Sequence, residues 1–140
     1  MYRPRKHRKL YSKRKRAENY DSDCIFCRLP DEQIIKSTNK FLVTRNIFPY
    51  SIWDHYPVGE HWMIIPKRHI EGITELDKAE SDELMKLFQE YEALGFNIFT
   101  RTPGNSMKTV AHQHTHLIKP TGKEQKFLIY IRKPHIHFHR

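Results

Sequence analysis

The sequence is short of the features that mark membrane and secreted proteins. It has two cysteines and five glycines in 140 residues, and no apolar run approaches the roughly 20 residues that a membrane span needs. No apolar stretch follows the basic N-terminus, so a secretory signal is not expected. The chain is long enough to bury a core without disulfides. We therefore expect a cytoplasmic protein with no membrane contact.

Acidic residues are absent from residues 1–16, MYRPRKHRKLYSKRKR, which carry nine lysines or arginines. The rest of the chain has sixteen basic and sixteen acidic residues, so the whole net charge of +9 lies in this segment. Like charges with few apolar side chains cannot offset the entropy lost on ordering, so we expect residues 1–19 to be a disordered tail. The tail is either a solvating end or a basic arm that contacts the phosphates of RNA or DNA.

Residues 20–140 are expected to form one folded domain. A helix of about 17 residues is predicted to begin at Asp77, with Glu80 completing a capping box, and to end at Gly95. Runs rich in β-branched and aromatic residues predict strands at 40–46, 61–67, 95–101, 109–119 and 126–133, with a loop over 46–60. One main helix among strands joined by short links favours an α+β fold with an antiparallel sheet of about five strands.

Histidines alternate with other residues twice, at 112, 114 and 116 and again at 135, 137 and 139. On a strand, the first three would form a row with neighbours roughly 6 to 7 Å apart at Cα, which suits a single Zn²⁺ poorly. Such a row suits an extended substrate, with one ring as nucleophile or base and the others handling charge and protons. The alternative is a surface strand or an incidental metal chelator, and the spacing alone does not decide between them.

Four motifs give the first histidine run a context. A turn containing glycine precedes it in GNSMKTVAHQHTHLI, and upstream lie CIFC at 24–27, NIFPY at 46–50 and HWMIIPKRH at 61–69. In this order they resemble the histidine-triad (HIT) nucleotide-binding superfamily over about 95 of the 140 residues. The resemblance implies a HIT-like fold for residues 20–140 and a homodimer paired through the helix and a strand. The second run has no such turn before it, and we interpret it as a C-terminal segment.

The resemblance also implies an enzyme that acts at the α-phosphate of a purine nucleoside 5′-phosphate derivative, either a phosphoramidate or a dinucleoside polyphosphate. His114 would be the nucleophile, forming a nucleotidyl-imidazole that water or another acceptor resolves. His116 would contact phosphate and protonate the leaving group, and His112 completes the triad. The residues implied in nucleotide binding are Asn46 at the ribose, Ile25, Phe26 and Phe48 around the base, and Asn105, Ser106, Lys108 and Thr109 at the phosphates.

The sequence departs from the family pattern at several positions. Gln113 and Thr115 stand where the family has apolar residues, and Glu60 stands where a glycine usually precedes the histidine at 61. Lys108 stands where many members have glutamine. A cation would thus replace a neutral donor near the phosphates.

Cys24 and Cys27 form a Cys-x-x-Cys pair, which is typical of a redox pair, of half a zinc site or of plain core thiols. Several branches of the family complete a zinc site with two histidines, and the matching positions here are His69 and His112. The resemblance therefore implies a structural Zn²⁺ bound by Cys24, Cys27, His69 and His112.

A function of a different class also remains open. The chain could be a binding protein associated with nucleic acid, in which the fold is kept without catalysis and the basic tail binds the polyanion. Formation of a nucleotidyl-histidine distinguishes the enzyme from the binding protein.

Overall fold

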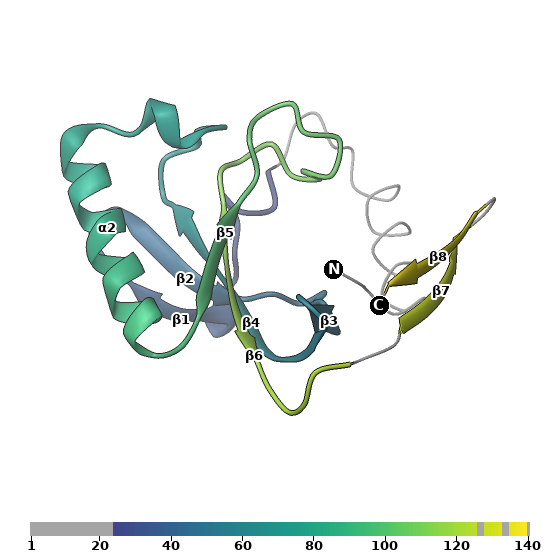
Figure 1. Ribbon diagram of the computed structural model, residues 1–140. Coiled ribbons are helices and arrows are strands. Elements are labelled where there is room, and N and C mark those ends of the chain that lie inside the picture. Colours follow the sequence, from purple (N-terminus) through teal and green to yellow (C-terminus); the bar gives the residue numbers. More distant parts are fainter. Residues whose placement is uncertain (1–23, 126–127, 133–134, 140) are drawn as a thin grey trace.

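The computed structural model describes residues 24–125, 128–132 and 135–139. The expected tail at 1–19 lies outside these residues. A six-stranded antiparallel sheet forms the centre of the fold, with β1, β2, β4, β6 and β5 in that order and β3 paired to β4 (Figure 1). The bounds are β1 (Ile34–Ser37), β2 (Phe41–Arg45), β3 (Ile52–Trp53), β4 (Tyr56–Pro66), β5 (Asn97–Thr100) and β6 (Thr115–Pro120).

The main helix, α2 (Lys78–Ala93), covers one face of this sheet (Figure 1). Its N-terminus has the predicted capping box, because the Asp77 carboxylate accepts from the Glu80 amide over 2.7 Å and the Glu80 carboxylate accepts from the Asp77 amide over 2.9 Å. Gly95 follows the helix with φ at +84°, a conformation that glycine adopts without strain. The prediction of this helix is confirmed.

The core between helix and sheet explains why these elements pack together. Leu84, Leu87 and Tyr91 of α2 are buried against Phe96, just before β5, and against apolar side chains of the sheet, namely Phe41, Val43, Ile64 and Leu117. Burying each large apolar side chain contributes about 1.5–3 kcal/mol, so this layer is the main stabilising contact of the fold.

The opposite face of the sheet carries a second, smaller cluster. Met63 and Ile65 of β4 pack there with Phe26 and Val110, whereas Ile64 between them faces the helix. Since side chains alternate along a strand, His61 shares the face of Met63 and Ile65. The candidate site described below lies on this side of the sheet.

Two 3-10 helices and a second, smaller sheet complete the described chain. The 3-10 helices are Asp31–Gln33 and Ile73–Glu75, and the strands β7 (Leu128–Arg132) and β8 (His135–His139) form a separate two-stranded antiparallel sheet. The second histidine run thus lies on β8. In the part of the chain that the structure describes, no helix is long and apolar enough to cross a membrane.

The predicted fold class is confirmed. β1 was not predicted, and β7, which lies within the strand predicted at 126–133, belongs to the separate sheet. Two further local predictions were wrong. The strand predicted at 109–119 begins only at Thr115. The backbone before it bonds elsewhere, since the Gln113 amide donates to the Ile70 carbonyl over 2.6 Å. His112 and His114 therefore precede the strand, and the row of three histidines on one strand does not form.

The second error is the loop predicted over 46–60, which contains β3 and the first half of β4. These two strands form a hairpin in which Ile52 pairs with Pro57 and Trp53 with Tyr56. The two turn residues, Asp54 and His55, have φ of 45° and 67°, as a tight hairpin turn requires. The Asp-His pair is not the Asn-Gly type that predicts such a turn.

Candidate metal and nucleotide site

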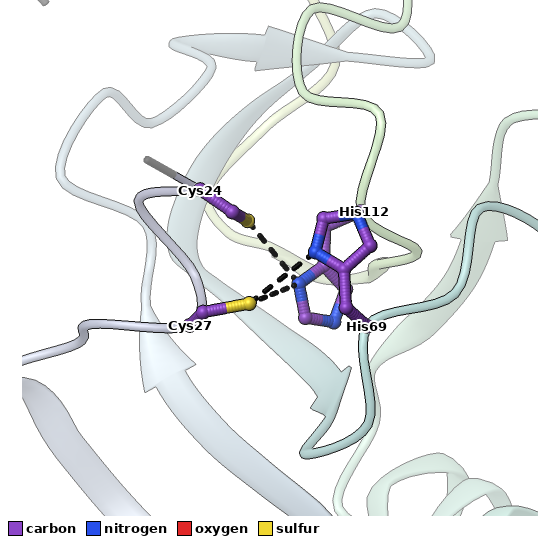
Figure 2. Close-up of side chains that lie close together, drawn as sticks. All are labelled: Cys24, Cys27, His69 and His112. Carbon is purple, nitrogen blue, oxygen red and sulfur yellow. Dashed lines mark hydrogen bonds between the residues drawn. The ribbon is translucent and has the colours of Figure 1, made fainter. Parts of the chain in front are cut away.

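Four side chains from three parts of the chain converge beside the sheet. Cys24 and Cys27 come from the N-terminal turn, His69 from the segment after β4, and His112 from the segment before β6 (Figure 2). Their ligand atoms all lie within 4.8 Å of one another. The Sγ of Cys27 is 3.3 Å from His69 Nδ1, and the Sγ of Cys24 is 3.3 Å from His112 Nδ1. The four residues predicted as metal ligands are thus brought together.

The donor set fits a tetrahedral metal ion. Bonds of about 2.3 Å to sulfur and 2.0–2.1 Å to nitrogen would place neighbouring ligands roughly 3.3–3.8 Å apart, close to the sulfur–nitrogen distances here. The Nε2 of His112 donates to the Pro66 carbonyl over 2.9 Å, so its neutral ring turns an unprotonated Nδ1 toward the two sulfurs. Histidines that bind a metal usually donate their other ring N–H to a carboxylate, a backbone carbonyl or water, as His112 does here.

Burial shifts the pKa values of two residues in this cluster, His112 and Cys27. It lowers the pKa of His112, which keeps the ring neutral and able to bind a metal. Desolvation and the neighbouring Cys24 raise the pKa of the Cys27 thiol. A bound cation would reverse that effect, because it stabilises the thiolate.

His114 lies two residues beyond the cluster and is buried, with 6% of its surface exposed. Its Nδ1–H donates to the His112 carbonyl over 2.8 Å. This fixes the tautomer, so that the lone pair of the neutral ring is on Nε2. Phe26 packs edge-on against the ring with centroids 5.1 Å apart. Desolvation lowers the pKa of His114 to about 4, which leaves the ring neutral near pH 7.

His116, on β6, is held by a histidine of β4. The Tyr50 amide donates to His61 Nδ1 over 3.0 Å, so the proton of neutral His61 is on Nε2. That nitrogen lies 2.9 Å from His116 Nδ1, to which it donates. The proton of neutral His116 is consequently on Nε2. The rings of His116 and His114 lie 5.0 Å apart at an angle of 85°.

His61 is a member of this site that the sequence prediction missed. It stands at the start of the HWMIIPKRH motif, and its alternation with the buried Met63 and Ile65 was a usable signal. Asn46 lies beside it, with Nδ2 at 3.2 Å from His61 Nε2 and Oδ1 accepting from the Phe48 amide over 2.9 Å. The residue expected at the ribose is thus 3.2 Å from the histidine pair.

The other residues predicted to bind nucleotide lie in three segments, namely the N-terminal turn, the loop after β2 and the turn before His112. Ile25 packs on the Phe26 cluster and Phe48 is half-buried. The turn at 102–108 is closed by the Lys108 amide, which donates to the Asn105 carbonyl over 2.8 Å. Ser106 is exposed on it and Thr109 is half-buried just after it.

The two polar departures from the family pattern are both buried. Gln113 donates from Nε2 to the Thr100 hydroxyl over 2.7 Å and accepts from Lys108 Nζ over 3.4 Å. Thr115 opens β6, where it pairs with Ile64 and Thr100. The expected polar outward face is therefore an interior polar layer, and Gln113 joins the Lys108 loop to β5.

Known proteins resemble this chain in sequence. Residues 29–123 match the family model described as HIT domain. The chain is 28% identical over 124 residues to the adenosine 5′-monophosphoramidase HINT3 of Mus musculus, covering 79% of this chain and 70% of that protein. It is 28% identical over 123 residues to Protein hit of Bacillus subtilis (strain 168), covering 79% of this chain and 77% of that protein.

Solved structures show the same fold. The diadenosine triphosphate hydrolase of Plasmodium falciparum, solved in complex with Cyclomarin A, superposes with a TM-score of 0.58 at 16% identity. The match covers 69% of this chain and 66% of that one.

Proposed function

Because the chain belongs to the HIT domain family, a family that includes nucleotide hydrolases, we propose that it acts at the α-phosphate of nucleoside 5′-phosphate derivatives, with His114 as nucleophile. The observation that carries this proposal is the bond from His114 Nδ1 to the His112 carbonyl. It leaves an unprotonated Nε2 on a ring whose burial lowers its pKa to about 4. Such a ring is a nucleophile at neutral pH without a separate base.

The reaction proceeds in two displacements. His114 Nε2 attacks the α-phosphorus, a phosphorus–nitrogen bond forms, and the bond to the leaving group breaks. The leaving group takes the proton from His116 Nε2, whose position follows from the His61 contact. Water then attacks the α-phosphorus, a phosphorus–oxygen bond forms, and the phosphorus–nitrogen bond breaks. One proton of the water returns to His116 Nε2, and the nucleoside monophosphate leaves neutral His114.

Two similar proteins support the choice of substrate class. One relative is described as an adenosine 5′-monophosphoramidase and one structural neighbour as a diadenosine triphosphate hydrolase. We therefore place the substrate among purine phosphoramidates and dinucleoside polyphosphates. Asn46 would contact the ribose, and the turn before Thr109 would contact phosphate. Ile25, Phe26 and Phe48 would enclose the base, with Asn105, Ser106 and Lys108 at the phosphates.

The metal of the cluster in Figure 2 is proposed to be Zn²⁺, held by Cys24, Cys27, His69 and His112. Two thiolates and two imidazoles are a donor set that zinc prefers in structural sites. When bound, the ion supplies a tether between the N-terminal turn and the sheet. His114 and His116 keep their own contacts and take no part in binding it.

A homodimer is also part of the proposal. Among the described strands, β5 pairs only with β6, so its other edge can extend the sheet to a second copy. Ile98 and Phe99 on this strand are half-buried. Sedimentation of the full chain as a monomer would refute the dimer.

We also propose a cytoplasmic location, because neither Cys24 nor Cys27 forms a disulfide and thiols stay reduced in the cytoplasm.

The test of the proposed function is trapping of the covalent intermediate. Brief incubation with an adenosine 5′-phosphoramidate, acid-free quenching and intact mass measurement should show a nucleotidyl adduct on the wild type and none on His114→Ala. The control is His137→Ala, which removes the middle histidine of the second run and should keep the adduct. An adduct on His114→Ala, or its loss in the control, would contradict the assignment.

The second candidate function is nucleic-acid binding, favoured by the nine cations in residues 1–16. Deletion of this segment should leave turnover of a small nucleotide within about twofold and flatten the salt dependence of RNA or DNA binding. A wild type that binds RNA but forms no adduct supports the binding protein over the enzyme.

A further inference from the structure

We propose that Lys108 and Arg101 make the site selective for phosphoanhydrides, whose leaving group is itself an anionic phosphate, over phosphoramidates with an amine leaving group. This inference rests on the proposed function and narrows its substrate class. It follows from two cations that contact neighbours of the histidine pair, Lys108 at Gln113 and Arg101 at Phe99.

Lys108 is joined to the site through the residue that precedes the nucleophile. Its ammonium donates to the Gln113 amide oxygen over 3.4 Å and to the Glu71 carbonyl. Gln113 is buried, and its backbone is held by the Ile70 carbonyl over 2.6 Å. The ammonium is therefore held at Gln113, the residue before His114, by contacts that do not involve a substrate.

The charge of Lys108 lacks a direct counter-ion within the described residues. Both of its hydrogen bonds are to uncharged oxygens, and the nearest acids act only at longer range. Of these, the Glu75 carboxylate is already used by the amides of Glu71 and Gly72, each at 2.9 Å. Desolvation lowers the pKa of Lys108. A half-buried cation of this kind is stabilised by a bound anion.

Arg101 follows directly after β5. Its Cζ is 4.9 Å from the centroid of the Phe99 ring. That ring in turn stacks on His116, with centroids 5.9 Å apart and an angle of 22°. The neighbouring Thr100 hydroxyl lies 3.4 Å from the His114 carbonyl, to which it donates. The Phe99 ring therefore contacts both the Arg101 guanidinium and His116, the proposed proton donor.

Two cationic side chains contact the surroundings of His114 and His116. The Lys108 ammonium lies 3.4 Å from the Gln113 amide oxygen, and the Arg101 guanidinium lies 4.9 Å from the centroid of the Phe99 ring, so both side chains bring positive charge. A field of this sign stabilises negative charge that develops on a departing phosphate. An amine leaves as a neutral or protonated group and gains nothing from two cations. The described surroundings therefore favour the anhydride.

The experiment compares two substrates with the same nucleotidyl group, diadenosine triphosphate and adenosine 5′-phosphoramidate. In Lys108→Gln and in Arg101→Gln, kcat/KM for the triphosphate should fall about tenfold or more beyond any fall for the phosphoramidate. Lys108→Arg keeps the charge and should keep most of the ratio of kcat/KM for the triphosphate to kcat/KM for the phosphoramidate. Lys86→Gln removes the same charge from the exposed face of α2 and should leave the ratio unchanged.

Equal losses on both substrates, or an equal effect of Lys86→Gln, would overturn the inference and leave the proposed function intact. If the wild type turns over neither substrate, the proposed function fails. The inference is then tested separately by measuring nucleotide binding. In a His114→Ala background, ADP should bind more tightly than AMP, and Lys108→Gln should reduce that preference about tenfold. An unchanged preference would contradict the role of Lys108.

Discussion

His61 and His116 face one another across strands β4 and β6, with the Nε2 of the first 2.9 Å from the Nδ1 of the second. The register that aligns Met63 with His116 brings the two rings together. Because the Tyr50 amide occupies the other nitrogen of His61, the bond has one direction, from His61 to His116. His61 therefore determines which nitrogen of His116 carries the proton.

Replacement of His61 by phenylalanine should impair proton delivery while keeping the ring volume. We expect kcat to fall about 10- to 100-fold, with a steeper dependence on the pKa of the leaving group, because His116 loses the partner that places its proton. The measurement is a series of nucleotidyl substrates with graded leaving groups, with the melting temperature as a check on folding. A uniform loss across the series would argue for a merely structural role.

The cysteine and histidine cluster should bind about one Zn²⁺ per chain in the purified protein. Cys27→Ser should lose this metal and lower the melting temperature, because metal binding is linked to folding. The matched control is His55→Asn, since His55 lies in the hairpin turn outside the cluster and asparagine tolerates its φ of 67°. Elemental analysis and thermal unfolding measure both effects. A wild type without metal and with the stability of Cys27→Ser would contradict the site.

Acid should remove a stabilising contribution from the helix cap. The Arg68 guanidinium, with its Nη2 2.7 Å from the Glu80 carboxylate, holds the pKa of buried Glu80 down to about 2. The unfolded value is about 4.3, so this contribution is present above that pH and is lost as the pH falls toward 2. Urea unfolding between pH 5 and pH 2 should give a shallower decline for Glu80→Gln than for the wild type. Glu92→Gln, on the exposed end of α2, should decline like the wild type.

Truncation in the helix–sheet core should be costly. Leu87 is 3% exposed among Phe41, Ile64 and Leu117, and Leu87→Ala should lower the free energy of unfolding by about 2–5 kcal/mol. Leu94→Ala, at a site that is 52% exposed, should change it by less than about 0.5 kcal/mol. Chemical denaturation at constant pH measures both. Similar losses at the two positions would contradict the packing described for α2.

Local signals in the sequence predicted the helix and the fold class better than they predicted the backbone conformation around the site residues. The capping pair at Asp77 and Glu80, the apolar spacing after it and Gly95 define α2, because each acts within one or two turns of helix. The four metal ligands came from matching motifs. Their convergence is a tertiary fact, since Cys24 and His112 are 88 residues apart.

The errors have a tertiary cause as well. TVAHQHTHLIK alternates as a strand does, yet the bond from Gln113 to Ile70 holds its first half away from the sheet. The contacts of Lys108 with Gln113 and of Arg101 with the Phe99 ring could not be predicted from sequence, because they form only on folding. His61 was missed because its role depends on the register between β4 and β6.

His112 belongs to two sites at once, since its side chain faces the thiols and its carbonyl holds His114. Any free energy that couples the two sites must act equally in both directions. If metal at the thiols tightens nucleotide binding by some factor, nucleotide must tighten metal binding by the same factor. Bound substrate would then slow the loss of the ion to a chelator, and resistance to chelation becomes a measure of site occupancy that needs no turnover.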